Sequence, residues 1–290
     1  MASEFILKAP AKLNLLLRIT GKRADGFHEL VTLFHPVERI ADRIRMDLAS
    51  TSPGITMACS HPDVPADSSN LIVKAASAFA QKMGLSPAWH LELVKNIPIA
   101  AGMGGGSSDA GTVLRFLAAH FPGCSGRELN ALAASIGADV PFFLDPCDAA
   151  GRGIGEKLSH LQIPASPPML ALFPNFPVRA VWAYRNLKKI TPPGQAEKEL
   201  AALVEALRQH DWEKAASLCA NDLEDALFAK FPLLSRLRRT LLEQKALCVH
   251  VSGSGPTLFA IFGSEEQLRQ AAQALETPEN SGTGIRIMEC

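Results

Sequence analysis

A glycine-rich stretch that runs into two serines is the first candidate for chemistry. It comprises Gly102, Met103, Gly104, Gly105, Gly106, Ser107 and Ser108. Because glycine lacks a Cβ, this backbone can adopt positive φ and turn its N–H groups toward negative oxygens. Apolar residues then recur at helical spacing over residues 110–121, and the N-terminus of such a helix would add its dipole. The stretch therefore predicts a phosphate-binding loop that leads into a helix.

Two familiar phosphate motifs are absent from the loop. No lysine follows its last glycine as in a P-loop, and no glycine triplet forms the dinucleotide fingerprint. A loop that only makes a tight turn is thus the alternative at this point. Ser107, Ser108 and Asp109 each offer an N-cap for the helix.

Asp139 is the candidate carboxylate. It follows Gly137, which ends an expected helix, and precedes an apolar run over residues 140–144 that predicts a strand. We expect a largely buried carboxylate that needs a partner. Lys12 and Asn14 are two positions apart in an expected strand and would share one face. From spacing alone, Lys12 and Asp139 could form an internal salt bridge, and Asn14 could bond a neighbouring loop.

Composition limits the function classes. The 290 residues carry 29 basic and 29 acidic side chains, so no net field attracts nucleic acid or an anionic membrane. No segment is typical of a membrane span, and the N-terminal residues enter a strand pattern without a signal peptide, so we expect a cytoplasmic protein. The six cysteines include no Cys-x-x-Cys pair and the histidines no His-x-x-x-His pair, so we expect neither disulfides nor a transition metal.

The pattern of elements predicts an α+β protein of two domains, residues 1–160 and 161–290, with glycines and prolines between them at 151–168. Strands are expected at 5–19 (two strands joined at a bend), 30–37, 43–48, 55–59, 89–94, 169–173, 247–251, 257–262 and 284–288. Helices are expected at 71–83, 125–136, 197–209, 212–220, 233–245 and 265–275. A second glycine loop occupies residues 252–256.

Several motifs together resemble the GHMP kinases. They are Pro10-Ala11-Lys12-Leu13-Asn14-Leu15, the glycine–serine loop, and Val251-Ser252-Gly253-Ser254-Gly255-Pro256-Thr257. Residues 21–30 (GKRADGFHEL) and 137–142 (GADVPF) are similar to a branch of the family whose acceptor alcohol carries a cytidine diphosphate. The resemblance covers nearly the whole chain. It implies a two-domain GHMP-kinase-like fold, ATP and Mg²⁺, and phosphorylation of the 2-hydroxyl of 4-diphosphocytidyl-2-C-methyl-D-erythritol in the non-mevalonate isoprenoid precursor pathway.

The resemblance also implies roles for individual residues. Asp139 would be the general base and Lys12 its partner, and Asn14 would contact the acceptor. Phe27 would stack on cytosine, His28 would hydrogen-bond the base, and Tyr184 would be a second stacking aromatic. ATP phosphates would bind at residues 102–108 with Mg²⁺ near Ser107 or Ser108, and the adenine would lie near Asn70 and Lys95.

Purely structural roles stay open as alternatives for some of these positions. Asn70 could simply cap a helix and Lys95 could be a solvated strand end. We expect the second glycine loop to support the phosphate loop, and Asp109 to point away from the phosphates. Residues 221–224 (NDLE) also resemble a family segment, but no role follows from their pattern.

Two other function classes compete with this interpretation. Another GHMP kinase would act on homoserine or mevalonate, which have no base for Phe27 and His28 to bind. A non-catalytic nucleotide or metabolite sensor on the same fold would not need both Lys12 and Asp139. The expected partner is a small molecule, and a monomer and a homodimer are both compatible with the sequence.

Overall fold

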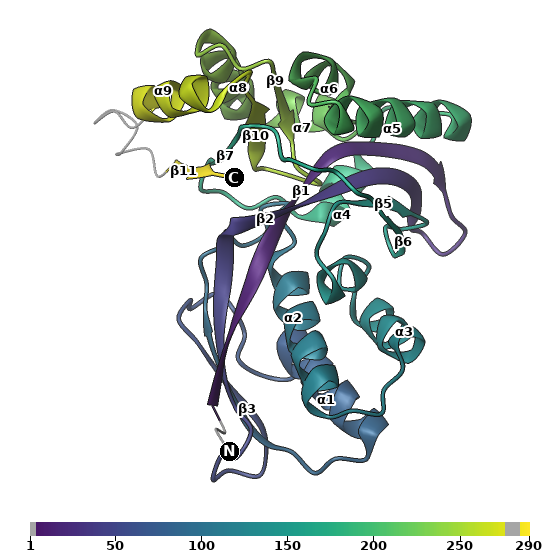
Figure 1. The fold of residues 1–290 in the computed structure, drawn as a ribbon, viewed down its shortest axis with the longest axis vertical. Coiled ribbons are helices and arrows are strands. Elements are labelled where there is room, and N and C mark those ends of the chain that lie inside the picture. Colours follow the sequence, from purple (N-terminus) through teal and green to yellow (C-terminus); the bar gives the residue numbers. More distant parts are fainter. Residues whose placement is uncertain (1–3, 276–284) are drawn as a thin grey trace. The chain divides into compact units, whose positions relative to one another are not determined.

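The computed structural model describes residues 4–275 and 285–290, which form two compact units interleaved along the chain. Unit 1 comprises residues 4–11, 40–97 and 104–146, and unit 2 comprises residues 12–39, 98–103 and the described residues from 147 onward. Strands β1 (Glu4–Lys22) and β2 (His28–Asp47) contribute to both units (Figure 1). The division at residue 160 stays a prediction, since units defined by contacts need not follow chain order.

Unit 1 is a sheet covered on one face by helices. Its strand order is β3-β4-β2-β1, with β3 parallel and β2 antiparallel to β4. Helices α1 and α2 bury Phe79, Val113 and Leu114 against Ile44 and Leu91 of the sheet (Figure 1). The remaining elements of unit 1 are β3 (Gly54–Cys59), α1 (Leu71–Met83), β4 (Ala88–Val94), α2 (Gly105–His120), α3 (Gly126–Ile136) and the 3₁₀ helix η1 (Pro141–Leu144).

Local signals fix the ends of two helices as the sequence predicts. Gly84 ends α1 with φ +64°, a left-handed conformation that glycine adopts without steric cost. Ser125 and Glu128 form the predicted capping box at the start of α3, each side chain bonding the other residue's backbone N–H.

Three predictions for strands are wrong. The first strand is continuous through Pro10 with no bend that divides it, and the segments expected at 30–37 and 43–48 form one strand, β2. The run over residues 140–144 is the 3₁₀ helix η1, with Pro141 at its first turn. A short apolar run has no periodicity that separates a strand from a buried helical turn, and proline is well placed at a helix start.

Unit 2 contains two groups of strands. In one, β2, β1 and β8 lie side by side and β5 and β6 extend from β2. In the other, the order is β11-β7-β10-β9, and every neighbouring pair is antiparallel. Helices α8 (Pro232–Glu243) and α9 (Glu265–Leu275) pack on this sheet through Leu237, Leu241 and Leu268 (Figure 1). The strands of unit 2 beyond β1 and β2 are β5 (Ala149–Arg152), β6 (Lys157–His160), β7 (Met169–Phe173), β8 (Ala220–Asn221), β9 (Cys248–Val251), β10 (Leu258–Ile261) and β11 (Arg286–Glu289).

The helices of unit 2 are α4 (Ala180–Arg185), α5 (Pro193–Arg208), α6 (Trp212–Leu218), α7 (Glu224–Lys230), α8 (Pro232–Glu243) and α9 (Glu265–Leu275). Sequence patterns missed α4, α7, β5, β6 and β8. These elements are two to seven residues long, and β5 and β8 gain their order by pairing with β2 and β1. The predicted strand at 284–288 appears as β11, and its residue 284 lies outside the described residues.

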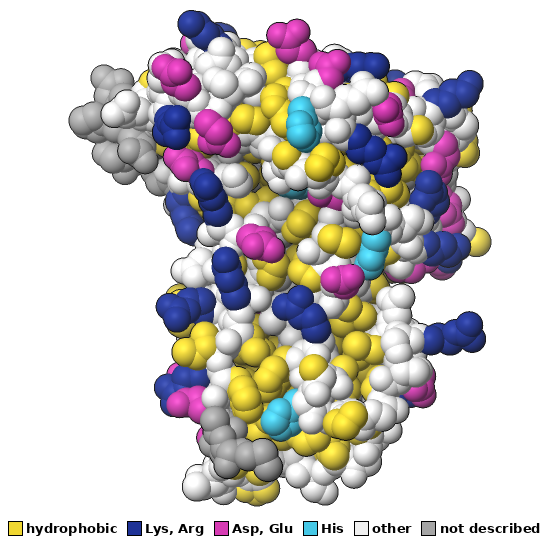
Figure 2. All heavy atoms as spheres, viewed as in Figure 1, with side chains coloured by type: hydrophobic (Ala, Val, Ile, Leu, Met, Phe, Trp, Pro, Cys, Tyr) yellow, Lys and Arg dark blue, Asp and Glu magenta, His cyan; other side chains and the backbone are white. Residues whose placement is uncertain are grey.

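The surface agrees with the balanced composition. Basic and acidic side chains are interspersed over the face that Figure 2 shows. Within residues 4–275 and 285–290, the chain has no helix of the length and apolar character that crossing a membrane requires.

Candidate active site

The phosphate-loop helix begins earlier than its predicted caps. Helix α2 starts at Gly105, and its N-cap is Gly104, which has φ +73° and makes no side-chain cap hydrogen bond. The prediction that Ser107, Ser108 or Asp109 caps the helix is therefore wrong, because all three already lie within it. A glycine cap supplies no oxygen for the first N–H groups of the helix, which suits them to an anionic ligand.

The two serines of the loop have different environments. Ser108 is buried, and its hydroxyl donates to the carbonyl oxygen of Pro10 at 2.5 Å. Ser107 is half-buried, and its Oγ lies 4.0 Å from the point where a Cβ on Gly137 would stand. Ser108 thus holds strand β1, whereas the Ser107 hydroxyl faces the turn that carries Asp139.

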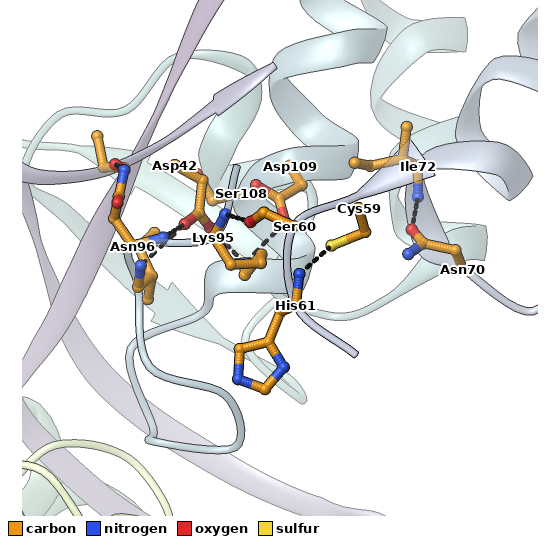
Figure 3. Close-up of polar contacts among 12 residues, drawn as sticks. Asp42, Cys59, Ser60, His61, Asn70, Ile72, Lys95, Asn96, Ser108 and Asp109 are labelled. Carbon is orange, nitrogen blue, oxygen red and sulfur yellow. Dashed lines mark hydrogen bonds and ion pairs between the residues drawn. The ribbon is translucent and has the colours of Figure 1, made fainter. Parts of the chain in front are cut away.

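Lys95 lies beneath the start of α2 in an ion cluster with two carboxylates. Its Nζ bonds Asp42 Oδ2 and, at 2.9 Å, Asp109 Oδ2, and a Cβ on Gly105 would stand 3.2 Å from it (Figure 3). Asp42 Oδ1 also accepts from the backbone N–H groups of Asn96 and Ile97. Because the Lys95 side chain is only 6% exposed, the alternative of a solvated strand end is wrong.

Burial and neighbouring charges shift the pKa values of Lys95 and Asp109. Burial lowers the pKa of Lys95, but the carboxylates of Asp109 and Asp42 outweigh it, so the net shift is upward. Burial, with the second carboxylate of Asp42, raises the pKa of Asp109 to about 8 against the attraction of Lys95. One ammonium cannot balance two buried carboxylates, so Asp109 is the group that holds a proton near neutral pH. Its side chain turns toward Lys95 in the interior. That it points away from bound phosphates stays a prediction.

Asn70 is a helix cap, as the simpler alternative proposes. Its Oδ1 accepts from the Ile72 N–H at 2.9 Å at the start of α1, and its Nδ2 donates to the Pro65 carbonyl at 2.7 Å (Figure 3). A role near the adenine stays a prediction for Asn70 and for Lys95.

Asp139 lies in the turn before η1 and is half-buried. That its carboxylate is largely buried stays a prediction. The turn is closed by the Val140 N–H bonding the Gly137 carbonyl at 3.1 Å. Gly111 of α2 lets this turn approach the helix, since a Cβ there would stand 2.6 Å from Phe143 Cβ and 2.9 Å from the Val140 oxygen. Close packing therefore positions the Asp139 turn against α2.

In unit 2, Lys12 and Asn14 are brought together on β1. Lys12 Nζ donates to Asn14 Oδ1 at 2.5 Å and lies 5.2 Å from the centre of the Phe34 ring. Asn14 Nδ2 donates to the Thr32 hydroxyl, which in turn donates to the Leu16 carbonyl. Lys12 and Asn14 are 4% and 3% exposed, so this network fixes a lysine ammonium in a largely desolvated place.

The second glycine loop supports the first part of the phosphate loop, as predicted. Ser252 Oγ donates to the Gly102 carbonyl at 3.0 Å, and the Thr257 N–H bonds the Ala101 carbonyl at 3.3 Å. Gly102 has φ +77°, and the buried Met103 accepts the Lys12 N–H through its carbonyl. Gly102 and Met103 therefore join the phosphate loop to the strand that carries Lys12.

The tip of the β1–β2 hairpin presents an aromatic group. Arg23 binds the carboxylates of Asp25 and Glu29, and Gly26 with φ +88° completes the turn. Phe27 is 57% exposed at this tip.

His28 is stacked on Tyr184 of α4, with ring centres 5.3 Å apart and planes inclined by 28°. Burial, together with the charge of Lys22, lowers the pKa of His28, which favours a neutral imidazole at pH 7.

Each unit thus assembles part of the predicted site. Lys12 with Asn14 and His28 with Tyr184 come together in unit 2, and Ser107 faces the Asp139 turn in unit 1. Lys12 and Asp139 belong to different units, so their pairing stays a prediction.

Sequence reasoning missed Asp42 and Thr32. A signal for Asp42 existed in the strand pattern. Asp42 shares the buried face of the strand with the apolar Ile40, Ile44 and Met46, and a carboxylate on that face needs a buried cation. Thr32 similarly interrupts a run of apolar residues in β2.

Comparisons with known proteins agree on one family. The family described as GHMP kinases N terminal domain matches residues 70–145, and the one described as GHMP kinases C terminal matches residues 203–280. The chain is 39% identical over 273 residues to the 4-diphosphocytidyl-2-C-methyl-D-erythritol kinase of Chlorobium chlorochromatii (strain CaD3), covering 92% of each chain. It is 38% identical over 289 residues to the kinase of the same name from Pelobacter propionicus, covering 98% of each chain.

Solved structures show the same relation. A crystal structure of 4-(cytidine 5'-diphospho)-2C-methyl-D-erythritol kinase matches with a TM-score of 0.81 and 35% identity, covering 98% of each chain. A homoserine kinase from Cytophaga hutchinsonii matches with a TM-score of 0.80 but only 18% identity, covering 100% of this chain and 95% of that one, and therefore indicates a shared fold alone.

Proposed function

This chain belongs to the GHMP kinase family, and on that premise we propose that it phosphorylates the 2-hydroxyl of 4-diphosphocytidyl-2-C-methyl-D-erythritol. It is an ATP-dependent small-molecule kinase. Relatives at 38–39% identity that span more than nine-tenths of the chain carry this substrate in their names, which supports the proposal. The reaction belongs to the non-mevalonate route to isoprenoid precursors.

The stacked His28–Tyr184 pair is the observation that carries the choice of acceptor. A neutral imidazole can donate and accept hydrogen bonds at the edge of a cytosine, and the exposed Phe27 ring beside it offers a face for stacking. Phenylalanine needs only its π face for this contact. Homoserine and mevalonate have no base that would use these three side chains.

We assign proton transfer to Asp139 and charge stabilisation to Lys12. Asp139 takes the proton of the 2-hydroxyl as the hydroxyl oxygen forms a bond to the γ-phosphorus and the bond from that phosphorus to the bridging oxygen of ADP breaks. Lys12 balances negative charge on the transferring group, and Asn14 fixes its ammonium while contacting the acceptor.

The start of α2 suits the phosphates of ATP. Gly104 leaves the first N–H groups of the helix without a side-chain cap, and Gly106 is exposed beside them. Ser107 is the serine we assign to Mg²⁺, because the Ser108 hydroxyl already binds Pro10. When bound, the ion would neutralise phosphate charge. Lys95 and Asn70 are assigned to the adenine side through the resemblance alone.

The test is ADP release in the presence of Mg²⁺ with three alcohols: the diphosphocytidyl compound, homoserine and mevalonate. The parent should turn over the cytidyl compound only. Asp139→Asn keeps the shape of the side chain but removes the base, so we expect kcat to fall about 10²- to 10⁴-fold. Asp63→Asn, which makes the same change at an exposed aspartate of unit 1, should leave kcat unchanged.

The outcomes separate the competing functions. Turnover of homoserine or mevalonate without the cytidyl compound would show that the base-binding assignment is wrong. Nucleotide binding without turnover of any alcohol would indicate a sensor. The neutral charge supports a small-molecule partner rather than nucleic acid, and a cytoplasmic location and the oligomeric state stay predictions.

A further inference from the structure

Residues 221–224 form a polar segment for which the sequence gives no role. The segment starts in β8, which pairs in parallel with β1 so that Asn221 lies opposite Leu17. Asp222 binds β1 as well, because its N–H bonds the Leu17 carbonyl and its carboxylate accepts from the Ile19 N–H at 2.9 Å and from Arg18 at 2.7 Å. The segment is therefore anchored to the strand that carries Lys12.

The Asn221 side chain turns from this anchor to the second glycine loop. Its Nδ2 donates to the carbonyl oxygens of Val251 and Gly253, each at 2.7 Å, and its Oδ1 accepts from the Leu223 N–H at 2.9 Å. The residue is only 6% exposed, so water cannot readily replace these bonds. Both carbonyls flank Ser252, and the amide thus fixes the backbone on either side of it.

Glu224 binds the end of β9, just before the same loop begins. Its Oε1 accepts from the Val251 N–H at 2.6 Å and lies 3.0 Å from His250 Nδ1. This contact ends at β9, whereas the Asn221 contacts reach two residues further, to Gly253. Asn221 is consequently the member of the segment that orders the loop itself.

The opposite side of the loop meets the lysine network. Ser252 Oγ accepts from the Asn14 N–H at 3.2 Å. Gly253 has φ +55°, and a Cβ there would stand 3.1 Å from Asn14 Oδ1 and 3.5 Å from Lys12 Nζ. The loop backbone therefore forms one wall of the space in which the Lys12 ammonium is held.

We propose that Asn221 is a positioning residue for Lys12, acting through the carbonyls of Val251 and Gly253 and through Ser252 on Asn14. The inference rests on the proposed function, since it is the proposed role of Lys12 that gives the position of its ammonium a kinetic consequence. Loss of the amide leaves two buried carbonyls without their donor, the loop shifts, and Lys12 loses its orientation.

The first test compares Asn221→Ala with Asp211→Ala. Asp211 caps α6 in the same unit by accepting from the Lys214 N–H, and it takes no part in the loop. Both variants should lower Tm. Asn221→Ala should also lower kcat for the cytidyl substrate about 10- to 100-fold, while KM for ATP changes less than threefold. Asp211→Ala should keep the kcat of the parent. Equal kcat in the two variants would overturn the proposal. If Asn221→Ala does not fold, Asn221→Asp keeps the volume and the acceptor for Leu223 while removing both donors.

A double-mutant cycle separates positioning from independent damage. Asn221→Ala and Ser252→Ala act on the same contact with Asn14, so the kcat loss of the double variant should be clearly smaller than the product of the two single losses. The combination of Asn221→Ala with Asp211→Ala should show only the loss of Asn221→Ala. A multiplicative loss with Ser252→Ala would contradict the proposed route.

Chemical labelling tests the position of Lys12 without measuring catalysis. Brief acetylation with acetic anhydride, read by peptide mass spectrometry, should modify Lys12 several-fold faster in Asn221→Ala than in the parent. Lys95, a second buried lysine, should keep its rate and serves as the internal control. An unchanged rate at Lys12, or equal increases at both lysines, would overturn the inference. Increased labelling of Lys12 alone, in a protein that phosphorylates no alcohol, would uphold the positioning contact and refute the proposed function.

Discussion

Lys95 of unit 1 and Lys12 of unit 2 are both buried, but their ammonium groups have different surroundings. Lys95 is bound by the carboxylates of Asp42 and Asp109. Within unit 2, Lys12 meets the amide oxygen of Asn14 and the ring face of Phe34. A carboxylate attracts an ammonium through a full charge, whereas an amide oxygen and a ring face attract it through partial charges.

The difference assigns different tasks to the two lysines. Lys95 ties β2, the end of β4 and α2 together and compensates charge inside unit 1. Asn14 fixes the direction of the Lys12 side chain, and we propose that the Lys12 ammonium stabilises the negative charge that develops on the transferring group. We therefore expect substitutions of Lys12 to affect catalysis and substitutions of Lys95 to affect stability.

The largest expected effect follows from removing the Lys12 charge. Lys12→Met keeps most of the apolar stem, and kcat for the cytidyl substrate should fall about 1,000-fold because the transferring group loses a preorganised cation. Steady-state ADP release measures the loss, and thermal melting should show a Tm near that of the parent. A variant that loses its fold together with its activity would remove the distinction drawn between the two lysines.

Removing Lys95 should act mainly on stability. Lys95→Met leaves the buried carboxyl groups of Asp42 and Asp109 without their cation, which should lower the free energy of unfolding by about 3 kcal/mol in urea titrations at pH 7. Lys82→Met, which removes a lysine paired with Glu128 at the surface, is the matched control and should change stability little. A parent-like urea midpoint for Lys95→Met would contradict a structural role for this ion cluster.

The smallest effect concerns the proton on Asp109. Its pKa is raised to about 8 in the folded chain, above the ordinary value near 4 of an unfolded aspartate. The stability gained from this proton is complete below pH 4 and is lost progressively as the pH rises to 8, because the unfolded chain releases the proton first. Asp109→Asn lacks this proton equilibrium, so its unfolding free energy relative to the parent should rise as the pH increases from 5 to 8. A constant difference between the two proteins across this range would show that Asp109 is ionised throughout.

Sequence patterns were most reliable where a local rule decides the structure. The capping box at Ser125, the glycine C-cap at Gly84 and the glycine-rich start of α2 all depend on residues within one or two turns. Sequence patterns failed where contacts with residues distant in the sequence determine the secondary structure. The two-residue β8 exists because β1 lies beside it, and the run at Pro141 became helical against α2.

The sequence by itself determined the residues that we propose for phosphoryl transfer: a glycine loop at a helix start, Lys12, Asp139, and aromatic groups for a base. Their types and order suffice because each needs only its own chemistry and a local turn or helix. Only the tertiary structure decided how they are used. It shows that the Ser108 hydroxyl and the Asn70 amide are taken up by structural hydrogen bonds, that Asp42 and Asp109 share Lys95, and that Asn221 reaches the loop beside Lys12. These assignments depend on which buried groups meet, because a buried polar atom must find a partner and long-range folding alone determines which partner is within reach.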